Sequence, residues 1–280
     1  MNAKKPLLIV KIRQNSVILR VTNHYLQGMD PLFSIITVTW NAADVLAPTL
    51  QSIQRQTFSD YELLLIDGAS TDGTLDIARQ ASIASMRVFS EPDNGLYDAM
   101  NKGIARARGK YLIFLNAGDS FASETVLARL AQLAATGPGV MYGQTQLVNA
   151  SRNVVGQRHL TAPKRLTKAS FVNGMLVCHQ AFVARRDIVP QYDLNYKLSA
   201  DYDWCIKVLK KSQANAYAGE APIISFLTEG MTARHHRKSL WERYRIMCRH
   251  YGMWNATVHH LGFIPRYLKR RLGGKDASGL

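Results

Sequence analysis

The sequence predicts an α/β fold in which a mostly parallel central sheet is flanked by helices. From Phe33 onward, short runs of apolar and β-branched residues alternate with segments whose apolar residues recur at helical spacing. Such alternation is typical of βαβ units, which build parallel sheets covered by helices. The chain has 280 residues and 47% hydrophobic content, which suffices for one large domain with a full core.

The first half of the chain contains the clearest alternation of elements. We expect strands over 33–40, 61–67, 86–90 and 110–116, and helices over 43–57, 74–82 and 97–107. A helix over 127–134 is followed by Thr-Gly-Pro-Gly, which breaks the chain. After this break, the segment 140–157 is interpreted as a hairpin with its turn at Asn-Ala-Ser-Arg-Asn. Further helices are expected around Trp204 and over 236–272.

Polar residues stand where four of the predicted strands end. They are Thr39 with Asn41, Asp67, Glu91 with Pro-Asp-Asn-Gly, and Asn116 with Asp119. The carboxyl ends of parallel strands share one edge, where ligands bind in α/β proteins. Asp67 suits a nucleobase or ribose, whereas Asp72 is interpreted as a helix cap. The loop after Asp67 is neither GxGxxG nor a Walker P-loop, so it lacks the fingerprints of dinucleotide oxidoreduction and ATP hydrolysis.

The most specific stretch is "EPDNGLYDAMNKGIARARGKYLIFLNAGD", residues 91–119. With the later "YDLNYKLSADY", it resembles the inverting family 2 glycosyltransferases, which have the GT-A fold. Within that family it is most similar to the enzymes of colanic-acid-type exopolysaccharide synthesis. The resemblance covers about Phe33 to Thr232. It implies a nucleotide-diphosphate sugar donor, and a cofactor, Mg²⁺ or Mn²⁺, held through a D-x-D motif.

The resemblance also assigns the donor side of the site. Residues at the family's donor-nucleotide positions are Thr37, Asn41, Asp67, Asp93 and Asn116. The first Asp of the D-x-D motif is Ala117 here, and Asp119 keeps the last position, that of the metal ligand. A hard cation that bridges two phosphates needs as little as one protein carboxylate. The alternative is that Asp119 only caps the following helix, but its position at a strand end favours the metal.

On the acceptor side, the resemblance makes Asp201 the general base, with Asp203 as the runner-up. The family's Glu-Asp pair is Ala200-Asp201 here. Both acids also suit the first turn of a helix, where they favour the helix dipole. His179, Thr232 and His235 are assigned to the acceptor or the diphosphate, although a lone histidine is more often structural.

A rival hypothesis comes from another functional class. Ala117 and Ala200 replace acids in the two motifs, which favours a non-catalytic nucleotide-sugar or nucleic-acid binding protein on a degenerate GT-A scaffold. Against it, each motif keeps the Asp that is assigned the essential role. The primary prediction is therefore an inverting glycosyltransferase of exopolysaccharide or cell-surface polysaccharide biosynthesis, with a saccharide or polyprenyl-diphosphate-linked saccharide acceptor.

Charge and cysteine usage predict where the protein works. The net charge is +15, and most of the excess follows Arg234, among Trp, Tyr and Leu residues. This pattern is typical of a helix that lies on an anionic membrane surface. Nucleic-acid binding or a packed helix pair would also explain it, but no nucleic-acid partner is expected. Three widely spaced cysteines favour a reducing compartment. We expect a cytoplasmic protein, peripheral on the inner face of the cell membrane.

These observations divide the chain into three regions. Residues 1–30 are expected to be an N-terminal extension, or to reflect a misassigned start, because Met29 stands just before the first strand. Residues 31–233 form the predicted GT-A domain, with a nucleotide-binding half over 31–120 and an acceptor half over 121–233. Residues 234–280 form a helical, basic, amphipathic C-terminal region.

Overall fold

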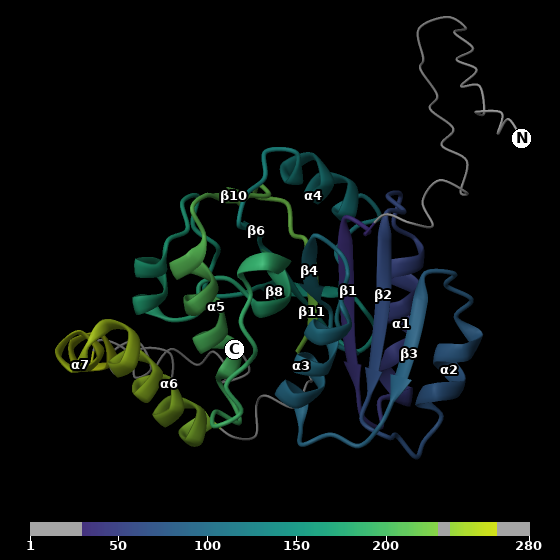
Figure 1. The fold of residues 1–280 in the computed structure, drawn as a ribbon, viewed down its shortest axis with the longest axis horizontal. Helices are drawn as coiled ribbons and strands as arrows, with labels where there is room; N and C mark the ends of the chain where they lie inside the picture. The colour runs from purple at the N-terminus through teal and green to yellow at the C-terminus, as the bar shows by residue number, and fades with distance from the viewer. Residues whose placement is uncertain (1–29, 229–235, 262–280) are drawn as a thin grey trace, which may run out of the picture. The chain divides into compact units, whose positions relative to one another are not determined.

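The computed structural model describes residues 30–228 and 236–261 (Figure 1). The compact unit of the chain begins at Pro31. The predicted N-terminal extension up to residue 29 lies outside the described residues, as do the loop over 229–235 and the tail over 262–280.

A seven-stranded sheet forms the centre, in the order β10-β6-β9-β4-β1-β2-β3. The four predicted strands of the first half are present and run parallel to one another. Their bounds are β1 Phe33–Thr39, β2 Tyr61–Asp67, β3 Met86–Ser90 and β4 Tyr111–Phe114. β1, at the middle of this group, is buried along its whole length, which explains why its sequence is a continuous apolar run and not an alternating one.

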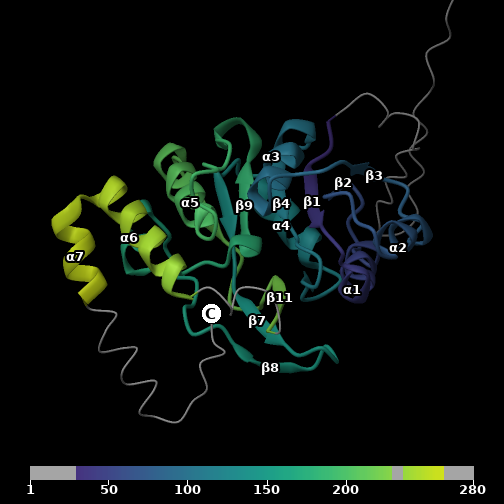
Figure 2. The same cartoon turned by 90° about the horizontal axis from the view of Figure 1, so that it is seen from below.

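The helices between these strands cover both faces of the sheet. α1 (Ala43–Gln54) and α2 (Thr74–Gln80) connect strands that step outward from β1, whereas α3 (Leu96–Arg106) returns from β3 to β4. Because βαβ crossovers are right-handed, this reversal puts α3 on the opposite face from α1 and α2 (Figure 2). The reversal occurs between β1 and β4, and such a point is where α/β sheets bind ligands.

The second half of the chain extends the sheet with one antiparallel strand. β9 (Phe182–Arg185) runs antiparallel between β4 and β6 (Val140–Tyr142), and β10 (Asn215–Tyr217) pairs with β6 at the edge. The beginning of β9 therefore lies at the same edge as the carboxyl end of β4. This geometry brings residues just before β9 to the polar edge of the sheet.

The predicted hairpin over 140–157 is corrected in one respect. Only β7 (Thr145–Val148) and β8 (Val154–Gln157) form it, while β6 joins the central sheet. The hairpin belongs to a second sheet, in the order β5-β11-β7-β8, with β5 at Ser120–Phe121 and β11 at Ile224–Leu227. α4 (Val126–Ala134) lies between β5 and β6 in the chain.

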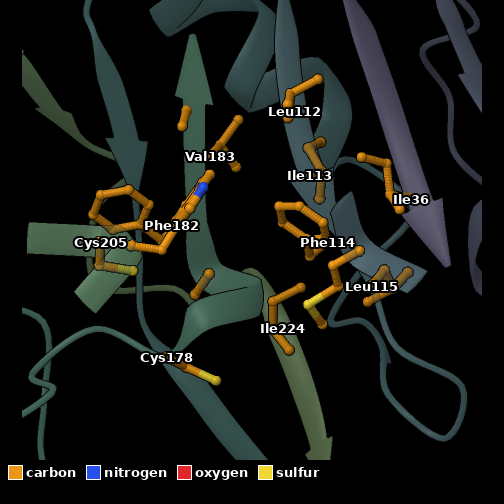
Figure 3. Packing of buried hydrophobic residues seen from close by; sticks show 14 of the residues in the cluster. Ile36, Leu112, Ile113, Phe114, Leu115, Cys178, Phe182, Val183, Cys205 and Ile224 are labelled. Carbon is orange, nitrogen blue, oxygen red and sulfur yellow. The ribbon is translucent and has the colours of Figure 1, made fainter. Parts of the chain in front are cut away.

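The core lies where the two halves of the chain meet. Phe114 of β4 and Phe182 of β9 both contact the ring of Trp204 edge-on, at centroid distances of 5.6 and 5.9 Å (Figure 3). Cys205 and Ile224 are buried in the same cluster. Cys205 thus behaves as a small hydrophobic residue, as its place in a helical pattern predicts.

The basic C-terminal region begins as two helices that pack on the domain (Figures 1 and 2). α6 (His236–Tyr251) and α7 (Met253–Leu261) are separated by Gly252, whose φ of 84° suits glycine. Ile246 and Met247 of α6 are buried beside α5 (Ala200–Lys211), and Glu242 accepts hydrogen bonds from the N–H groups just before α5. Among the described residues, no helix is long and apolar enough to span a membrane.

Candidate active site

The candidate site lies at the carboxyl edge of the parallel strands. In register, Thr39 at the end of β1 pairs with Asp67 at the end of β2, and Asp67 pairs with Ser90 at the end of β3. Asn116 follows β4, the neighbour of β1 on the other side. The predicted convergence of polar strand ends is therefore present.

Asp67 is the centre of the donor-side loops. Its side chain is fully buried and accepts four hydrogen bonds, from the hydroxyls of Thr39 (2.9 Å), Ser70 (2.6 Å) and Ser90 (2.7 Å) and from the Ser70 N–H (2.9 Å). Burial alone would raise the pKa of Asp67, but the hydrogen bonds from Ser70, Ser90 and Thr39 outweigh it and lower the pKa. The carboxylate stays ionised and ties three strand ends together.

Asn41 and Asp93 order the loops around Asp67. Asn41 has a φ of 47°, its N–H donates to Ser70 Oγ (2.8 Å), and its Oδ1 accepts from the Thr71 N–H (2.9 Å). Asp93 Oδ1 accepts from the Gly95 N–H (2.8 Å). A Cβ at position 68 would come within 2.5 Å of Asp93 Oδ2, so a glycine there allows the loops after β2 and β3 to approach.

Thr37 lies inside β1, two residues before the strand end, and its side chain is fully buried. Its Oγ1 has no hydrogen-bond partner among the described residues. The contact of Thr37 with the donor stays a prediction.

The turn after β4 presents Asn116 and Asp119. The Asp119 N–H donates to the Asn116 carbonyl (3.0 Å), which closes the turn. Thr49 of α1 also holds the turn, because its hydroxyl accepts a hydrogen bond from the Gly118 N–H (3.0 Å) and donates one to the Asp119 carbonyl (2.7 Å). Arg152, from the β7–β8 turn, donates to the Gly118 carbonyl (2.6 Å). Three parts of the chain thus hold this turn.

The Asp119 side chain is almost completely buried. Its oxygens accept hydrogen bonds from the Leu227 N–H of β11 (2.9 Å) and from the Gln180 side chain (2.5 Å). Burial raises the pKa of Asp119 to about 7, although the Leu227 and Gln180 hydrogen bonds and the nearby Arg152 charge oppose the shift. At neutral pH this carboxyl group is poised between its two protonation states.

The residues of this turn fit a divalent cation. Asn116 Oδ1 is buried and accepts no hydrogen bond from the described residues, so it has an unused lone pair. Together with the Asp119 carboxylate it offers oxygen ligands, which Mg²⁺ and Mn²⁺ prefer. No group of three or more His, Cys, Asp or Glu gathers among the described residues. The protein therefore suits a cation that draws most of its ligands from a diphosphate and water.

His179 lies inside the protein and not in an open pocket. It is in the short 3₁₀ turn His179–Ala181 before β9, packs against the rings of Phe114 and Trp204, and shares a hydrogen bond with the Tyr192 hydroxyl. Burial lowers the pKa of His179 to about 4, against the opposing charge of Asp201. The imidazole is therefore neutral at physiological pH, and its contacts are those of a structural histidine.

Asp201 lies in the first turn of α5 and is half-buried. Its Oδ1 accepts hydrogen bonds from the Tyr97 hydroxyl (3.1 Å) and from the Tyr202 N–H (2.9 Å). Contacts link both carboxyl groups to the 178–180 segment. On one side, Gln180 donates a hydrogen bond to Asp119. On the other side, His179 shares a hydrogen bond with Tyr192, whose ring stacks on Tyr97.

The runner-up, Asp203, has another task. It is fully buried, bonded to His250 Nε2 (2.6 Å) and paired with Lys207 Nζ (2.6 Å). Burial would raise the pKa of Asp203, but His250 and Lys207 more than offset this and lower it. Asp203 thus joins α5 to α6, and these contacts favour Asp201 over Asp203 as the predicted base.

Some functional residues lie beyond the sequence-based prediction. Gln180, Thr49, Arg152 and Tyr97 all contact the predicted site residues, and no local motif marks them as doing so. The predicted residues Thr232 and His235 lie outside the described residues.

The strand order, the reversal point and the polar edge define a doubly wound α/β protein with a candidate ligand site at the carboxyl edge of its parallel strands. Comparison with known proteins narrows this class. Residues 34–192 match the family described as Glycosyl transferase family 2, and the chain belongs to that family. A PGL/p-HBAD biosynthesis glycosyltransferase of Mycobacterium tuberculosis is 37% identical over 185 residues, which cover 63% of this chain and 69% of that protein.

Solved structures agree on the fold. Staphylococcus aureus TarS 1-349 in complex with UDP-GlcNAc superimposes with a TM-score of 0.64 at 17% identity, covering 86% of this chain and 74% of that one. The mannosyltransferase PcManGT of Pyrobaculum calidifontis, in complex with GDP-Man and Mn²⁺, gives 0.56 at 14% identity, covering 90% and 78%. The fold is GT-A, as the resemblance implies.

Proposed function

We propose that the protein is an inverting glycosyltransferase that moves a sugar from a nucleotide-diphosphate sugar to a saccharide acceptor. The observation that carries the proposal is that contacts link both Asp119 and Asp201 to the 178–180 segment, directly through Gln180 for Asp119 and through the stacked Tyr97 and Tyr192 for Asp201. One carboxylate suits a cation beside the diphosphate, and the other suits a base beside the acceptor. The nucleotide sugars in the TarS and PcManGT complexes, and the Mn²⁺ in the latter, support the donor class and the metal.

In the proposed reaction, Asp201 accepts the proton of the acceptor hydroxyl as the hydroxyl oxygen attacks the anomeric carbon. The bond from that carbon to the diphosphate oxygen breaks, and the nucleoside diphosphate leaves with the electron pair. Asp119 and Asn116 would hold Mg²⁺ or Mn²⁺, which when bound neutralises the charge that develops on the leaving group. The loops ordered by Asp67, Asn41 and Asp93 would hold the nucleoside.

We place the reaction in exopolysaccharide or cell-surface polysaccharide biosynthesis. The run "EPDNGLYDAMNKGIA" and its similarity to the colanic-acid-type enzymes support this. A polyprenyl-diphosphate-linked saccharide is the acceptor that best matches a basic protein surface, because its diphosphate is anionic and its lipid lies in a membrane.

The described part of the C-terminal region supports a peripheral place on the inner face of the cell membrane. Trp254, Val258 and Leu261 recur on one face of α7 and are exposed, Trp254 to 80%. Exposed cations at Lys238 and Arg245 lie on the adjoining α6. Exposed aromatic and apolar residues beside cations match an anionic lipid surface, with aromatic rings at headgroup depth.

Vesicle sedimentation tests the membrane contact. Wild-type protein should pellet with vesicles that contain phosphatidylglycerol and less with phosphatidylcholine alone. A Trp254→Ala, Val258→Ser double variant should stay in the supernatant, whereas Val154→Ser, an equally exposed valine on β8, should pellet like the wild type. If the double variant pellets fully, α7 is not the contact.

A rival function keeps one specific observation in its favour. Both Asp119 oxygens already accept hydrogen bonds, from Leu227 and Gln180, and Ala117 supplies no second carboxylate. A non-catalytic nucleotide-sugar binding protein needs neither a metal nor a base. It predicts binding without cation dependence and no turnover of any donor.

A thermal-shift panel separates the two hypotheses. UDP-, GDP- and dTDP-sugars are tested with and without Mn²⁺, and a transferase should be stabilised by one nucleotide class in a cation-dependent manner. Asp201→Asn should then keep the nucleotide-induced shift and lose transfer. An unchanged rate in Asp201→Asn would exclude Asp201 as the base.

A further inference from the structure

One face of α3 bridges the donor half and the acceptor half of the site. Tyr97 and Asn101 lie one helical turn apart. Asn101 clamps the backbone of Tyr192 at two points: its Nδ2 donates to the Tyr192 carbonyl (3.1 Å), and its Oδ1 accepts from the Tyr192 N–H (2.7 Å). Tyr97 donates its phenol hydrogen to Asp201 Oδ1 (3.1 Å). The helix that follows the donor-side turn thus directly contacts the proposed base.

A stack of rings holds Tyr97 in place. Its ring stacks on Tyr192 at 5.4 Å with an interplanar angle of 25°, and Tyr192 stacks on Trp204 at 5.2 Å and 12°. Trp204 belongs to α5, the helix that carries Asp201, and its indole N–H donates to the Pro190 carbonyl (2.8 Å). Because aromatic stacks have a preferred geometry, the phenol oxygen has little freedom to leave Asp201.

The chemistry of the pair gives Tyr97 a single role, that of a donor. Tyr97 is buried, and burial together with the adjacent Asp201 charge raises the pKa of its phenol well above the ordinary value. It therefore keeps its proton throughout the physiological range. Both hydrogen bonds that Asp201 accepts from the described residues, from Tyr97 and Tyr202, fall on Oδ1. Oδ2 accepts no hydrogen bond from the described residues.

We propose that Tyr97 is a positioning residue for the proposed base Asp201: its phenol fixes Oδ1, so that Oδ2 is presented to the acceptor hydroxyl. The inference rests on the proposed function, because it needs Asp201 to act as the base. It adds that the base is aligned by the donor-side helix α3, through Tyr97 and the Asn101 clamp, and not by α5 alone.

Tyr97→Phe tests the proposal, because it keeps the ring stack and removes the hydroxyl. The assay is release of the nucleoside diphosphate from the sugar selected in the thermal-shift panel, with water as the acceptor. We expect kcat to fall roughly tenfold, as for the loss of one hydrogen bond to a charged group. KM for the donor should be unchanged.

Tyr111→Phe is the matched control. It removes an equally buried phenol from β4, one that donates to the Pro138 carbonyl (3.0 Å) and not to the base. It should keep the kcat and the KM of the wild type. The proposal is overturned if Tyr97→Phe retains full activity, or if both tyrosine variants lose kcat equally.

Asp201→Asn separates this inference from the proposed function. If Asp201→Asn is inactive while Tyr97→Phe matches the wild type, Tyr97 does not position the base and the proposed function stands. If Asp201→Asn turns over the donor at the wild-type rate, the proposed base is wrong, and the role of Tyr97 is overturned with it.

Discussion

Two carboxyl groups at the same edge of the sheet, Asp67 at the end of β2 and Asp119 after β4, have opposite electrostatic environments. Both are buried, so desolvation raises the pKa of each. Asp67 accepts four hydrogen bonds, three of them from hydroxyl groups that rotate to meet it, and its pKa is lowered. Asp119 accepts two, and its pKa is raised to about 7. Asp119 is surrounded by more protein than Asp67 and also has fewer donors, and both differences favour its neutral form.

The charge of Asp67 organises the protein, whereas the charge of Asp119 responds to what binds beside it. Asp67 satisfies its charge within the protein, which lets it hold the ends of β1, β2 and β3 together in the absence of a ligand. Asp119 lacks enough donors, so a nearby cation would stabilise its ionised form. With both groups, the site has donor loops that Asp67 orders in advance and a carboxyl group, Asp119, whose charge depends on what binds.

The largest expected effect comes from removing the organising charge. Asp67→Ala leaves the hydroxyls of Thr39 and Ser90 and the Ser70 N–H without their acceptor. We expect the free energy of unfolding to fall by about 3 kcal/mol, since each unsatisfied buried donor is costly. Urea denaturation measures it. A loss no larger than that of an exposed substitution such as Asp76→Ala would show that Asp67 organises nothing.

Asp119→Asn should raise the free energy of unfolding where Asp67→Ala lowers it. The native state keeps the Asp119 proton up to about pH 7, whereas an unfolded chain releases it near its ordinary value of 3.8, so stability is lost as the pH rises between these values. Without the titrating group, the variant should be more stable than the wild type at about pH 8, on the order of 2 kcal/mol.

The gain in Asp119→Asn should shrink as the pH falls and vanish below about pH 4, where both states of the wild type are protonated. Thermal unfolding across this range measures it, in the absence of metal. A variant that is less stable than the wild type at every pH would contradict the raised pKa of Asp119.

The smallest expected effect comes from a variant in which Asp67 accepts fewer hydrogen bonds and so resembles Asp119. Ser90→Ala removes one of the four donors to Asp67, the 2.7 Å hydroxyl contact. Stability at neutral pH should fall by about 1 kcal/mol, and the loss should lessen in acid as the carboxylate gains a proton. Ser59→Ala, an exposed serine, is the control and should change little. A loss that does not depend on pH would mean that Ser90 does not act through Asp67.

Local patterns predicted the donor half well, because its strands are buried apolar runs and its loops follow them directly in the chain. They also placed Asp201 at a helix start. The environment of these residues was not predictable, because Asp119 meets Gln180 and Leu227 across separations of 61 and 108 residues. The antiparallel insertion of β9 creates the first of these contacts. The full burial of Thr37 and Asp203 was not predictable either, because sequence position does not report which side of an element is covered.

The affinity for Mn²⁺ as a function of pH, in the presence of the nucleotide sugar selected in the panel, tests the account most directly. A carboxyl group with a pKa of about 7 must lose its proton before it binds the cation, so affinity should be roughly tenfold weaker at about pH 6 than at about pH 8. In Asp119→Asn the affinity should be low at both values. Equal affinity at both pH values in the wild type, or the same pH dependence in the variant, would contradict the role assigned to Asp119.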